Sequence, residues 1–296
     1  MIKSMNDLIE FARRKGKKRI AVVYPMSKAV MEGLKLSEEL AYPVLFGNSE
    51  KIKELAEEVE LKDFEVYHAE TPKEAAYNAI SFVREKKADF LMKGKISTPD
   101  FLRAVLDKEK GLRSGQILSH IAVQEVPGYE RLVFLTDAGM NIRPDLKTKV
   151  EIIKNAIGVL KNLGYEEIKA AGLASIEQVS ENMPETLDYA VLAKMTDRGV
   201  FGKNFVFDGP LGFDIVASRE AAEMKGINTP VSQEADIWLC PDVASGNILS
   251  KALIYFSGAK VGGIIAGAKA PIILLSRSDT PDRKLYSIAF GIAALG

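Results

Sequence analysis

Residues 19–47, RIAVVYPMSKAVMEGLKLSEELAYPVLFG, contain the alternation that decides the fold class. Residues 19–24 are a short apolar, β-rich run that predicts a strand. The spacing of apolar residues over 28–40 predicts a helix, and residues 43–46 predict a second strand that ends at Gly47. Strands that alternate with helices in this way are typical of a parallel, doubly wound α/β sheet.

The same alternation continues along most of the chain. Further strands are expected at 65–68, 89–92, 168–174, 205–208, 237–240, 263–265 and 271–275, and helices at 50–58, 71–87, 99–106, 147–163, 184–197, 216–225, 248–256 and 282–294. Residues 121–126 and 131–136 break the pattern, because two strands separated only by Pro127-Gly128 favour an antiparallel pair. The sequence has no internal repeat and no low-complexity linker.

Composition excludes several classes of protein. The chain has 296 residues, with 40 Lys and Arg against 40 Asp and Glu, so no net charge indicates a nucleic-acid or membrane partner. The single cysteine, Cys240, excludes an internal disulfide and lies in an apolar strand, where a buried, inert thiol is expected. No apolar run has the length of a membrane span, and we expect a cytoplasmic protein.

A turn that follows the predicted strand 271–275 carries the first candidate site. Ser276 and Arg277 follow this strand, and Asp279 precedes a predicted helix. Serine and aspartate are ordinary helix caps, but no cap requires an arginine. A guanidinium beside a helix N-terminus suits a phosphate or a carboxylate, because both offer N–H donors to an anion.

A second candidate anion site lies between the strand 89–92 and the next helix. Lys93, Lys95, Ser97 and Thr98 surround Gly94, which lets a ligand approach the backbone. The alternative is that Ser97 or Thr98 only caps the helix. The spacing is not that of a P-loop, and no Gly-x-Gly-x-x-Gly follows the first strand, which disfavours a dinucleotide site.

Several of these motifs together resemble the phosphate acetyl/butyryltransferases, and more closely the butyryl branch. They are Lys93-Gly-Lys-Ile-Ser-Thr98, Phe207-Asp-Gly-Pro-Leu211, Ser245-Gly-Asn-Ile248, Gly267-Ala-Lys-Ala-Pro271 and Leu275-Ser-Arg-Ser-Asp279. The resemblance implies an architecture like that of isocitrate and isopropylmalate dehydrogenases, with the active site in a cleft between two domains. One domain would comprise residues 1–130 and 266–296, and the other 131–265.

The resemblance also implies the reaction, which is reversible transfer of a short acyl group, butyryl or similar, between coenzyme A and inorganic phosphate. It implies no bound cofactor, no metal and a homo-oligomer. Arg277 and Arg113 would neutralise phosphate, Ser276 would donate a hydrogen bond, and Asp208 and Asn247 would contact substrate. The general base is left open between Asp279, Asp282 and neither of them, because Arg283 stands where the acetyl branch has an acid.

Four alternatives to this function follow from the same residues. One is a phosphate acyltransferase of long-chain lipid synthesis, which would want a membrane-facing apolar patch that the sequence does not show. A phosphate acetyltransferase differs only in the acyl group. A non-catalytic sensor of coenzyme A or acyl phosphate would keep the pocket without turnover, and an NAD-dependent dehydrogenase of the same fold would need an aspartate cluster that the sequence lacks.

Overall fold

The protein is described by a computed structural model that covers residues 2–274, 276 and 279–296. Contacts divide the chain into two compact units. Unit 1 contains the first five residues and Ile117–Val261, and unit 2 contains Asn6–Gln116 and Gly262–Gly296. We describe each unit by itself.

The unit boundaries differ from the predicted domain boundaries at 130/131 and 265/266. Strands β5 (Ser119–Glu125) and β6 (Leu132–Thr136) form an antiparallel pair in which Glu125 lies opposite Leu132. The predicted boundary at 130/131 would separate these two strands, whereas their backbone hydrogen bonds keep both in unit 1. The antiparallel pairing itself is confirmed.

Unit 2 is built on a mostly parallel sheet with the strand order β3-β2-β1-β4-β11-β10. The antiparallel strand is β10, which pairs with β11 through Ile265 and Ile272, and its first two residues belong to unit 1. The strands are β1 (Lys18–Val23), β2 (Ala41–Gly47), β3 (Glu65–His68), β4 (Phe90–Lys93), β10 (Lys260–Ala266) and β11 (Ile272–Ile273).

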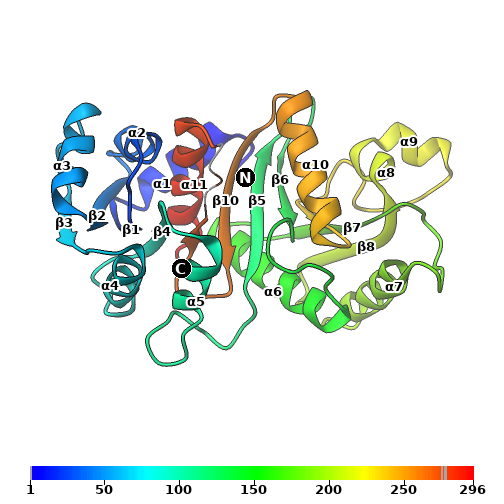
Figure 1. Ribbon diagram of the computed structural model, residues 1–296. Helices are drawn as coiled ribbons and strands as arrows, with labels where there is room; N and C mark the ends of the chain where they lie inside the picture. Colours follow the sequence, from blue (N-terminus) through cyan, green and yellow to red (C-terminus); the bar gives the residue numbers. More distant parts are fainter. Residues whose placement is uncertain (1, 275, 277–278) are drawn as a thin grey trace. The chain divides into compact units, whose positions relative to one another are not determined.

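Helices cover both faces of this sheet, as a doubly wound fold requires. Figure 1 shows α2, α3 and α11 above the strands and α4 and α5 below them. The helices are α1 (Met5–Arg14), α2 (Lys28–Leu36), α3 (Ser49–Glu58), α4 (Pro72–Arg84), α5 (Thr98–Val105) and α11 (Pro281–Ala293). Helix α1 was not predicted from the sequence, although its buried residues Met5, Leu8 and Ala12 recur at helical spacing.

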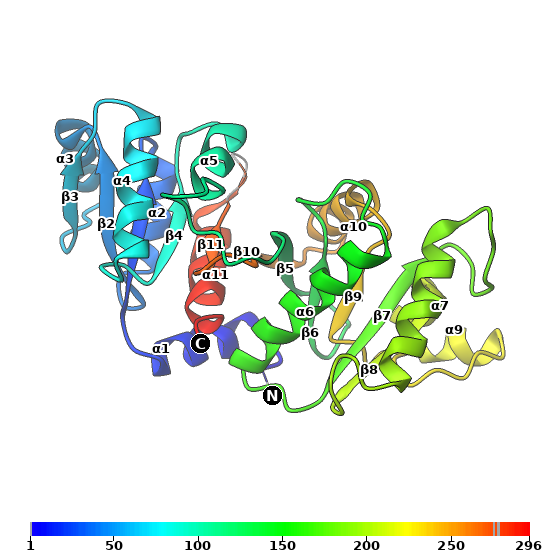
Figure 2. The same ribbon diagram turned by 90° about the horizontal axis from the view of Figure 1, so that it is seen from below.

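Unit 1 has a mixed sheet with the strand order β5-β6-β9-β7-β8, in which only the β5–β6 pair is antiparallel. Its remaining strands are β7 (Ile168–Ala174), β8 (Phe205–Gly212) and β9 (Ile237–Leu239). Its helices are α6 (Leu146–Asn162), α7 (Pro184–Asp197), α8 (Phe213–Ala217), α9 (Arg219–Met224) and α10 (Val243–Phe256). In the view of Figure 2, α6 and α7 lie in front of the strands of this unit.

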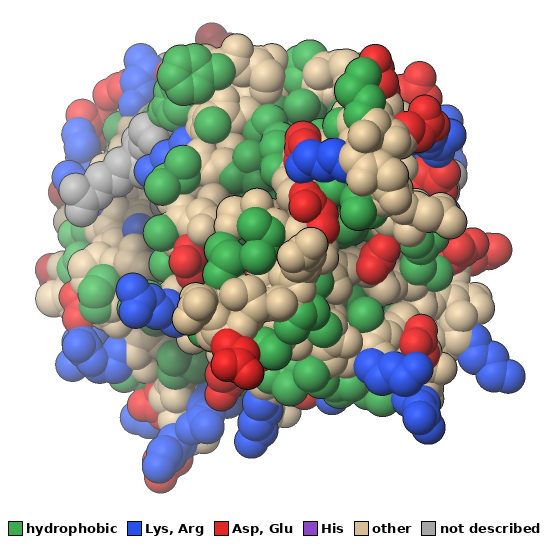
Figure 3. All heavy atoms as spheres, turned by 90° about the vertical axis from the view of Figure 1, so that its right-hand side faces the viewer, with side chains coloured by type: hydrophobic (Ala, Val, Ile, Leu, Met, Phe, Trp, Pro, Cys, Tyr) green, Lys and Arg blue, Asp and Glu red, His purple; other side chains and the backbone are tan. Residues whose placement is uncertain are grey.

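The surface agrees with the balanced composition. Acidic and basic side chains are interspersed on the face that Figure 3 shows. Among the described residues, no helix is long and apolar enough to cross a membrane. The α/β class predicted from the sequence is therefore confirmed, with a mixed sheet.

Candidate active site

Three parallel strands of unit 2 end side by side at the edge where the predicted site residues gather. Val23 in β1 lies opposite Lys93 in β4, and Met92 lies opposite Ile273 in β11. The segments that follow β4 and β11 therefore leave the sheet at the same, carboxyl-terminal edge. Ligands of open α/β sheets bind at this edge, because the loops that follow the strands converge there.

Lys93 and Gly94 fix the backbone at this edge. The Lys93 side chain is buried, and its ammonium donates to the carbonyl oxygen of Gly94 at 3.3 Å. Gly94 packs against the end of β1, where an added Cβ would lie 2.3 Å from the Val23 carbonyl oxygen. Only glycine permits this approach, so the backbone between β4 and α5 is held against β1.

Ser97 is the N-cap of α5, as the alternative reading of the sequence required. Its hydroxyl oxygen accepts a hydrogen bond from the Asp100 backbone N–H at 3.2 Å and donates to the Asp100 carboxylate at 2.5 Å. Arg103 donates to the other carboxylate oxygen at 2.6 Å. These hydrogen bonds, first from Ser97 and then from Arg103, lower the pKa of Asp100. Lys95 and Thr98 are exposed beside this network.

Ser276 and Asp279 form a closed turn after β11. The Ser276 backbone N–H donates to the Asp279 carboxylate at 2.7 Å, and the Asp279 N–H donates to the Ser276 carbonyl oxygen at 3.2 Å. Arg283 lies 4.0 Å from the same carboxylate. The Asp279 carboxylate is thus engaged in holding the turn. Arg277 lies outside the described residues.

The two remaining candidate site residues of unit 2, Asp282 and Arg113, lie apart from each other. Asp282 is exposed in the first turn of α11, which Thr280 caps. Arg113 forms a backbone bridge with Ala268, in the segment that leads into β11, whereas Ser276 follows β11. The backbone of Arg113 therefore lies towards the opposite edge of the strands, and its role stays a prediction.

In unit 1, Asp208 is part of a strand rather than of a turn at its end. Strand β8 continues to Gly212 through a register shift opposite β7, and the expectation of a turn at Asp208 was wrong. Gly209 makes the shift possible, because its φ of 158° suits glycine and its Cα faces the backbone of Gly172. Asp208 accepts a hydrogen bond from the Gly209 N–H at 2.9 Å.

Asn247 also differs from its expected setting. Helix α10 begins at Val243, five residues before the predicted start at Ile248, so Asn247 lies within the helix. Its amide donates to the Ala138 carbonyl oxygen at 3.4 Å. Asp242 was not singled out as a site residue, yet it is the N-cap and accepts from the Ser245 N–H at 2.7 Å. An Asp ahead of a helical pattern is the signal that places the start there.

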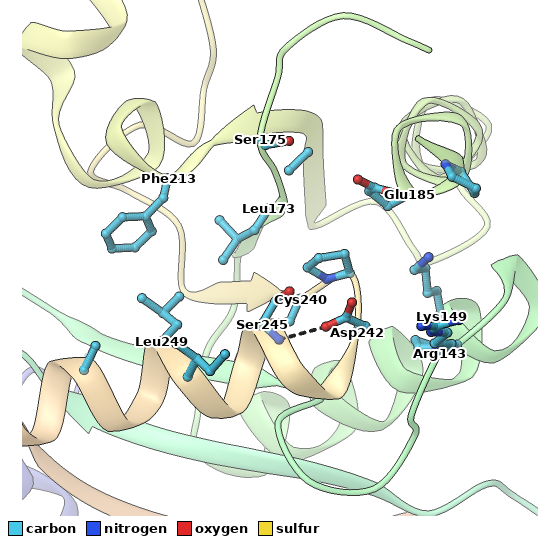
Figure 4. Close-up of a pocket in the computed structure, with 16 residues that line it drawn as sticks. Arg143, Lys149, Leu173, Ser175, Glu185, Phe213, Cys240, Asp242, Ser245 and Leu249 are labelled. Carbon is cyan, nitrogen blue, oxygen red and sulfur yellow. Dashed lines mark hydrogen bonds between the residues drawn. The ribbon is translucent and has the colours of Figure 1, made fainter. Parts of the chain in front are cut away.

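A pocket of about 780 Å³ lies within unit 1, where β7 and β9 end. One end is apolar and the other is charged, as Figure 4 shows. Phe213, Leu173 and Leu249 form the apolar end, and Arg143, Lys149 and Glu185 lie at the charged end. Other lining residues include Ser175, Cys240, Asp242, Ser245, Ile248 and Ala252. Neither Asp208 nor Asn247 is among them.

The charged end of the pocket could not be predicted from the sequence. Lys149 lies in α6 with only 2% of its surface exposed, and its ammonium pairs with Asp188 of α7 at 2.6 Å. No local pattern links residues that lie 39 positions apart. Cys240 reaches the pocket wall although it is almost fully buried, and this burial raises the pKa of its thiol.

Within residues 2–274, 276 and 279–296, no group of three or more His, Cys, Asp and Glu side chains has the arrangement of a metal site. The two candidate regions are an edge of unit 2 with lysine and serine donors, and an amphipathic pocket in unit 1. The first suits a small anion. The second is large enough for an organic ligand.

Comparison with known proteins assigns these features to one family. A family model described as "Phosphate acetyl/butaryl transferase" matches residues 49–292. Phosphate butyryltransferase of Clostridium acetobutylicum is 40% identical over all of this chain and 99% of its own length. Phosphate acetyltransferase of Thermotoga maritima is also 40% identical, over 96% of this chain and 97% of its own.

Solved structures agree with this result. A branched-chain phosphotransacylase from Enterococcus faecalis superposes with a TM-score of 0.85 at 29% identity, covering 94% of this chain and 99% of its own. A putative 4-hydroxythreonine-4-phosphate dehydrogenase from Salmonella typhimurium shares the fold alone, with a TM-score of 0.57 at 13% identity over 94% and 99% of the two chains. The fold is therefore one that dehydrogenases also use, as expected. This chain belongs to the phosphate acetyl/butyryl transferase family and is an acyltransferase.

Proposed function

We propose that this protein transfers a short-chain acyl group reversibly between coenzyme A and inorganic phosphate. The family match over residues 49–292 carries this proposal. Unit 2 supports it, because Lys93, Ser97 and Ser276 follow neighbouring parallel strands that end at one edge of the sheet. An edge with several N–H, O–H and ammonium donors is suited to a phosphate dianion.

The reaction exchanges one bond to the acyl carbon for another. A phosphate oxygen attacks the thioester carbonyl carbon, a C–O bond forms, and the C–S bond breaks. The sulfur leaves as a thiolate that takes up a proton, and in the reverse direction the thiol loses this proton. Negative charge grows on the carbonyl oxygen in the transition state, so fixed donors near that oxygen accelerate the reaction.

The residue roles that we propose follow from this charge. Arg277 neutralises the phosphate, because its planar fork binds two oxygens at once. Ser276 donates a hydrogen bond to the reacting oxygens, and Lys93, Lys95, Ser97 and Thr98 contribute to anion binding. We propose that Asp208 and Asn247 contact the substrate.

The contacts within unit 2 favour one of the two candidates for the general base, Asp279 and Asp282. The Asp279 carboxylate accepts the Ser276 N–H and faces Arg283, so proton transfer to it would weaken the turn that presents Ser276. Asp282 is exposed in the first turn of α11, where taking up a proton would not disturb the hydrogen bond that holds Ser276. We propose Asp282 as the group that accepts the thiol proton.

The acyl chain length is the open part of the proposal. The two relatives compared above, one named for butyryl and one for acetyl transfer, are each 40% identical, so this identity alone does not choose the acyl group. The pocket of unit 1 has about 780 Å³ and an apolar end, and we propose that it receives part of the acyl-CoA rather than phosphate.

Release of free thiol from coenzyme A esters tests the function. Acetyl-, propionyl-, butyryl- and isobutyryl-CoA are compared with and without phosphate, and we expect phosphate-dependent release that is fastest for butyryl-CoA. Equal release without phosphate would indicate a hydrolase. No release from any of the esters, together with measurable coenzyme A binding, would favour the sensor.

We also propose that the protein self-associates through α10. Ile248, Tyr255 and Phe256 expose 68%, 65% and 93% of their surface, and their spacing places them on one helix face. Monomers rarely leave such an apolar face in water. Light scattering should show an oligomer that Phe256→Glu dissociates, whereas Met224→Glu, at an exposed position on α9, should not. A monomeric wild-type protein would refute this.

A further inference from the structure

Lys284 is a lysine buried in the helix that follows the Ser276 turn. Only 3% of its surface is exposed, in the first half of α11. Its aliphatic stem packs against α2 at Gly33, where an added Cβ would lie 2.6 Å from the Lys284 Cβ and 2.8 Å from its Cδ. The two helices therefore meet around this side chain, and a glycine makes room for it.

The ammonium of Lys284 points back to the turn that precedes α11. It donates to the carbonyl oxygen of Asp279. The Asp279 carboxylate accepts the Ser276 N–H at 2.7 Å, and the Asp279 N–H donates to the Ser276 carbonyl oxygen at 3.2 Å. A continuous set of hydrogen bonds thus leads from Lys284 through Asp279 to Ser276.

The packing of α11 against α2 does not by itself require a charged side chain at position 284. A leucine or methionine would fill the same volume against α2 without the cost of burying an ammonium. Among the described residues, the Lys284 ammonium forms no ion pair within 4.0 Å, and the charges that act on it are those of Asp279, Glu32 and Arg283. Burial lowers the pKa of Lys284 accordingly. What the ammonium contributes is its bond to the Asp279 carbonyl.

We propose that Lys284 is a positioning residue for acyl transfer, which holds Ser276 in place through Asp279. The proposal rests on the proposed function, because Ser276 must act in that reaction. Lys284 itself touches no substrate in this scheme. Its ammonium fixes the Asp279 backbone, and the Asp279 carboxylate then fixes the Ser276 backbone at the edge of the sheet.

A double-mutant cycle tests whether Lys284 acts through Ser276. Lys284→Met keeps most of the volume and removes the donor, and Lys53→Met, at an exposed position on α3, is the matched control for the lost charge. We expect Lys284→Met to lower kcat roughly 10- to 100-fold, the scale of a small misplacement, with KM for phosphate changed less than about threefold. In a Ser276→Ala background the same substitution should cost less than about twofold.

Each other outcome overturns the proposal in a recognisable way. An equal fold loss in both backgrounds would show that Lys284 acts independently of Ser276. A lower melting temperature with unchanged kcat would show a purely structural role.

Lys284→Gln, which can still donate to the carbonyl, should recover most of the lost kcat. If Lys284→Met does not fold, Asp279→Ala removes the next link, the carboxylate that accepts the Ser276 N–H, and should show the same non-additivity. No phosphate-dependent thiol release by the wild-type protein would overturn both the proposed function and this role.

Discussion

Helices α5 and α10 both begin just after a parallel strand, one in unit 2 and one in unit 1, and their first turns differ in charge. At the start of α5 the cap is the neutral Ser97, and the cations Lys93 and Lys95 outnumber the carboxylate of Asp100. At the start of α10 the cap is itself an anion, Asp242. The helix dipole favours an anion at each of these two N-termini, but at α10 a carboxylate already occupies that place.

The residues around α10 strengthen this difference. The pocket there has the cations Arg143 and Lys149, against the carboxylates of Glu185, Asp242 and the Lys149 partner Asp188. Its formal charge is thus negative, whereas that of the α5 start is positive. This comparison teaches that equivalent positions in a strand–helix unit need not bind the same ligand. Phosphate is expected at unit 2, and a larger, partly apolar group at unit 1.

The largest expected effect is on the use of phosphate. It compares the loss of a cation at the edge of unit 2 with the loss of a cation in the pocket of unit 1. Lys93→Met should lower kcat/KM for phosphate roughly 10- to 100-fold, because hydrogen bonds to charged groups contribute about 1.5–3 kcal/mol. Arg143→Met should leave KM for phosphate within about twofold. Initial rates at saturating acyl-CoA measure both. A larger loss of phosphate affinity in Arg143→Met would place the phosphate in unit 1 and break the comparison.

A smaller effect tests the charged cap of α10. The hydrogen bond from the Ser245 N–H lowers the pKa of Asp242, so its folded pKa lies below the ordinary carboxyl value. The stability it contributes is therefore complete above the ordinary carboxyl pKa and is lost as the pH falls through the folded pKa. Asp242→Ala should cost about 1 kcal/mol at neutral pH, and clearly less at about pH 3.

The matched control is a neutral cap in unit 2. Asn48 caps α3 by accepting from the Lys51 N–H at 2.9 Å. Asn48→Ala should also cost about 1 kcal/mol, but equally at both pH values. Urea unfolding of the two variants and the wild-type protein measures the costs. A cost of Asp242→Ala that did not change with pH would contradict the ionised cap.

The smallest expected effect concerns the thiol in the pocket of unit 1. Cys240→Ala should leave turnover within about twofold of the wild-type value, because a buried thiol with a raised pKa behaves as a small hydrophobe. Stability should fall modestly through lost packing. Loss of all turnover in a folded Cys240→Ala protein, or an acyl group found on Cys240, would instead make the pocket the catalytic centre.

Much of the fold could be predicted from local signals. Strand β7 and helix α7 were predicted with their observed bounds, because an apolar run and a proline at the first helical position mark them. The turn at Lys93–Thr98 followed from the same kind of signal, and the alternative that Ser97 or Thr98 caps the next helix was confirmed at Ser97. Local sequence also indicated the family, since its motifs are short and contiguous.

Other features depended on contacts between residues far apart in the sequence. The continuation of β8 past Asp208 requires the backbone of Gly172, and the unit boundary depends on the pairing of β5 with β6. The early start of α10 is instead a local feature, because it is set by the Asp242 cap, which the apolar pattern alone did not reveal.

The sequence by itself determined the α/β class, most elements and the chemical type of the candidate residues, because these depend on periodicity, capping and side-chain chemistry. Only the tertiary structure decided which of these residues meet. It packed Lys284 against Gly33 of α2, paired Lys149 with Asp188, and placed the backbone of Arg113 beside Ala268, in the segment before β11. The physical reason is that burial and hydrogen bonding act between side chains that folding brings within a few ångströms, and their separation along the chain carries no such information.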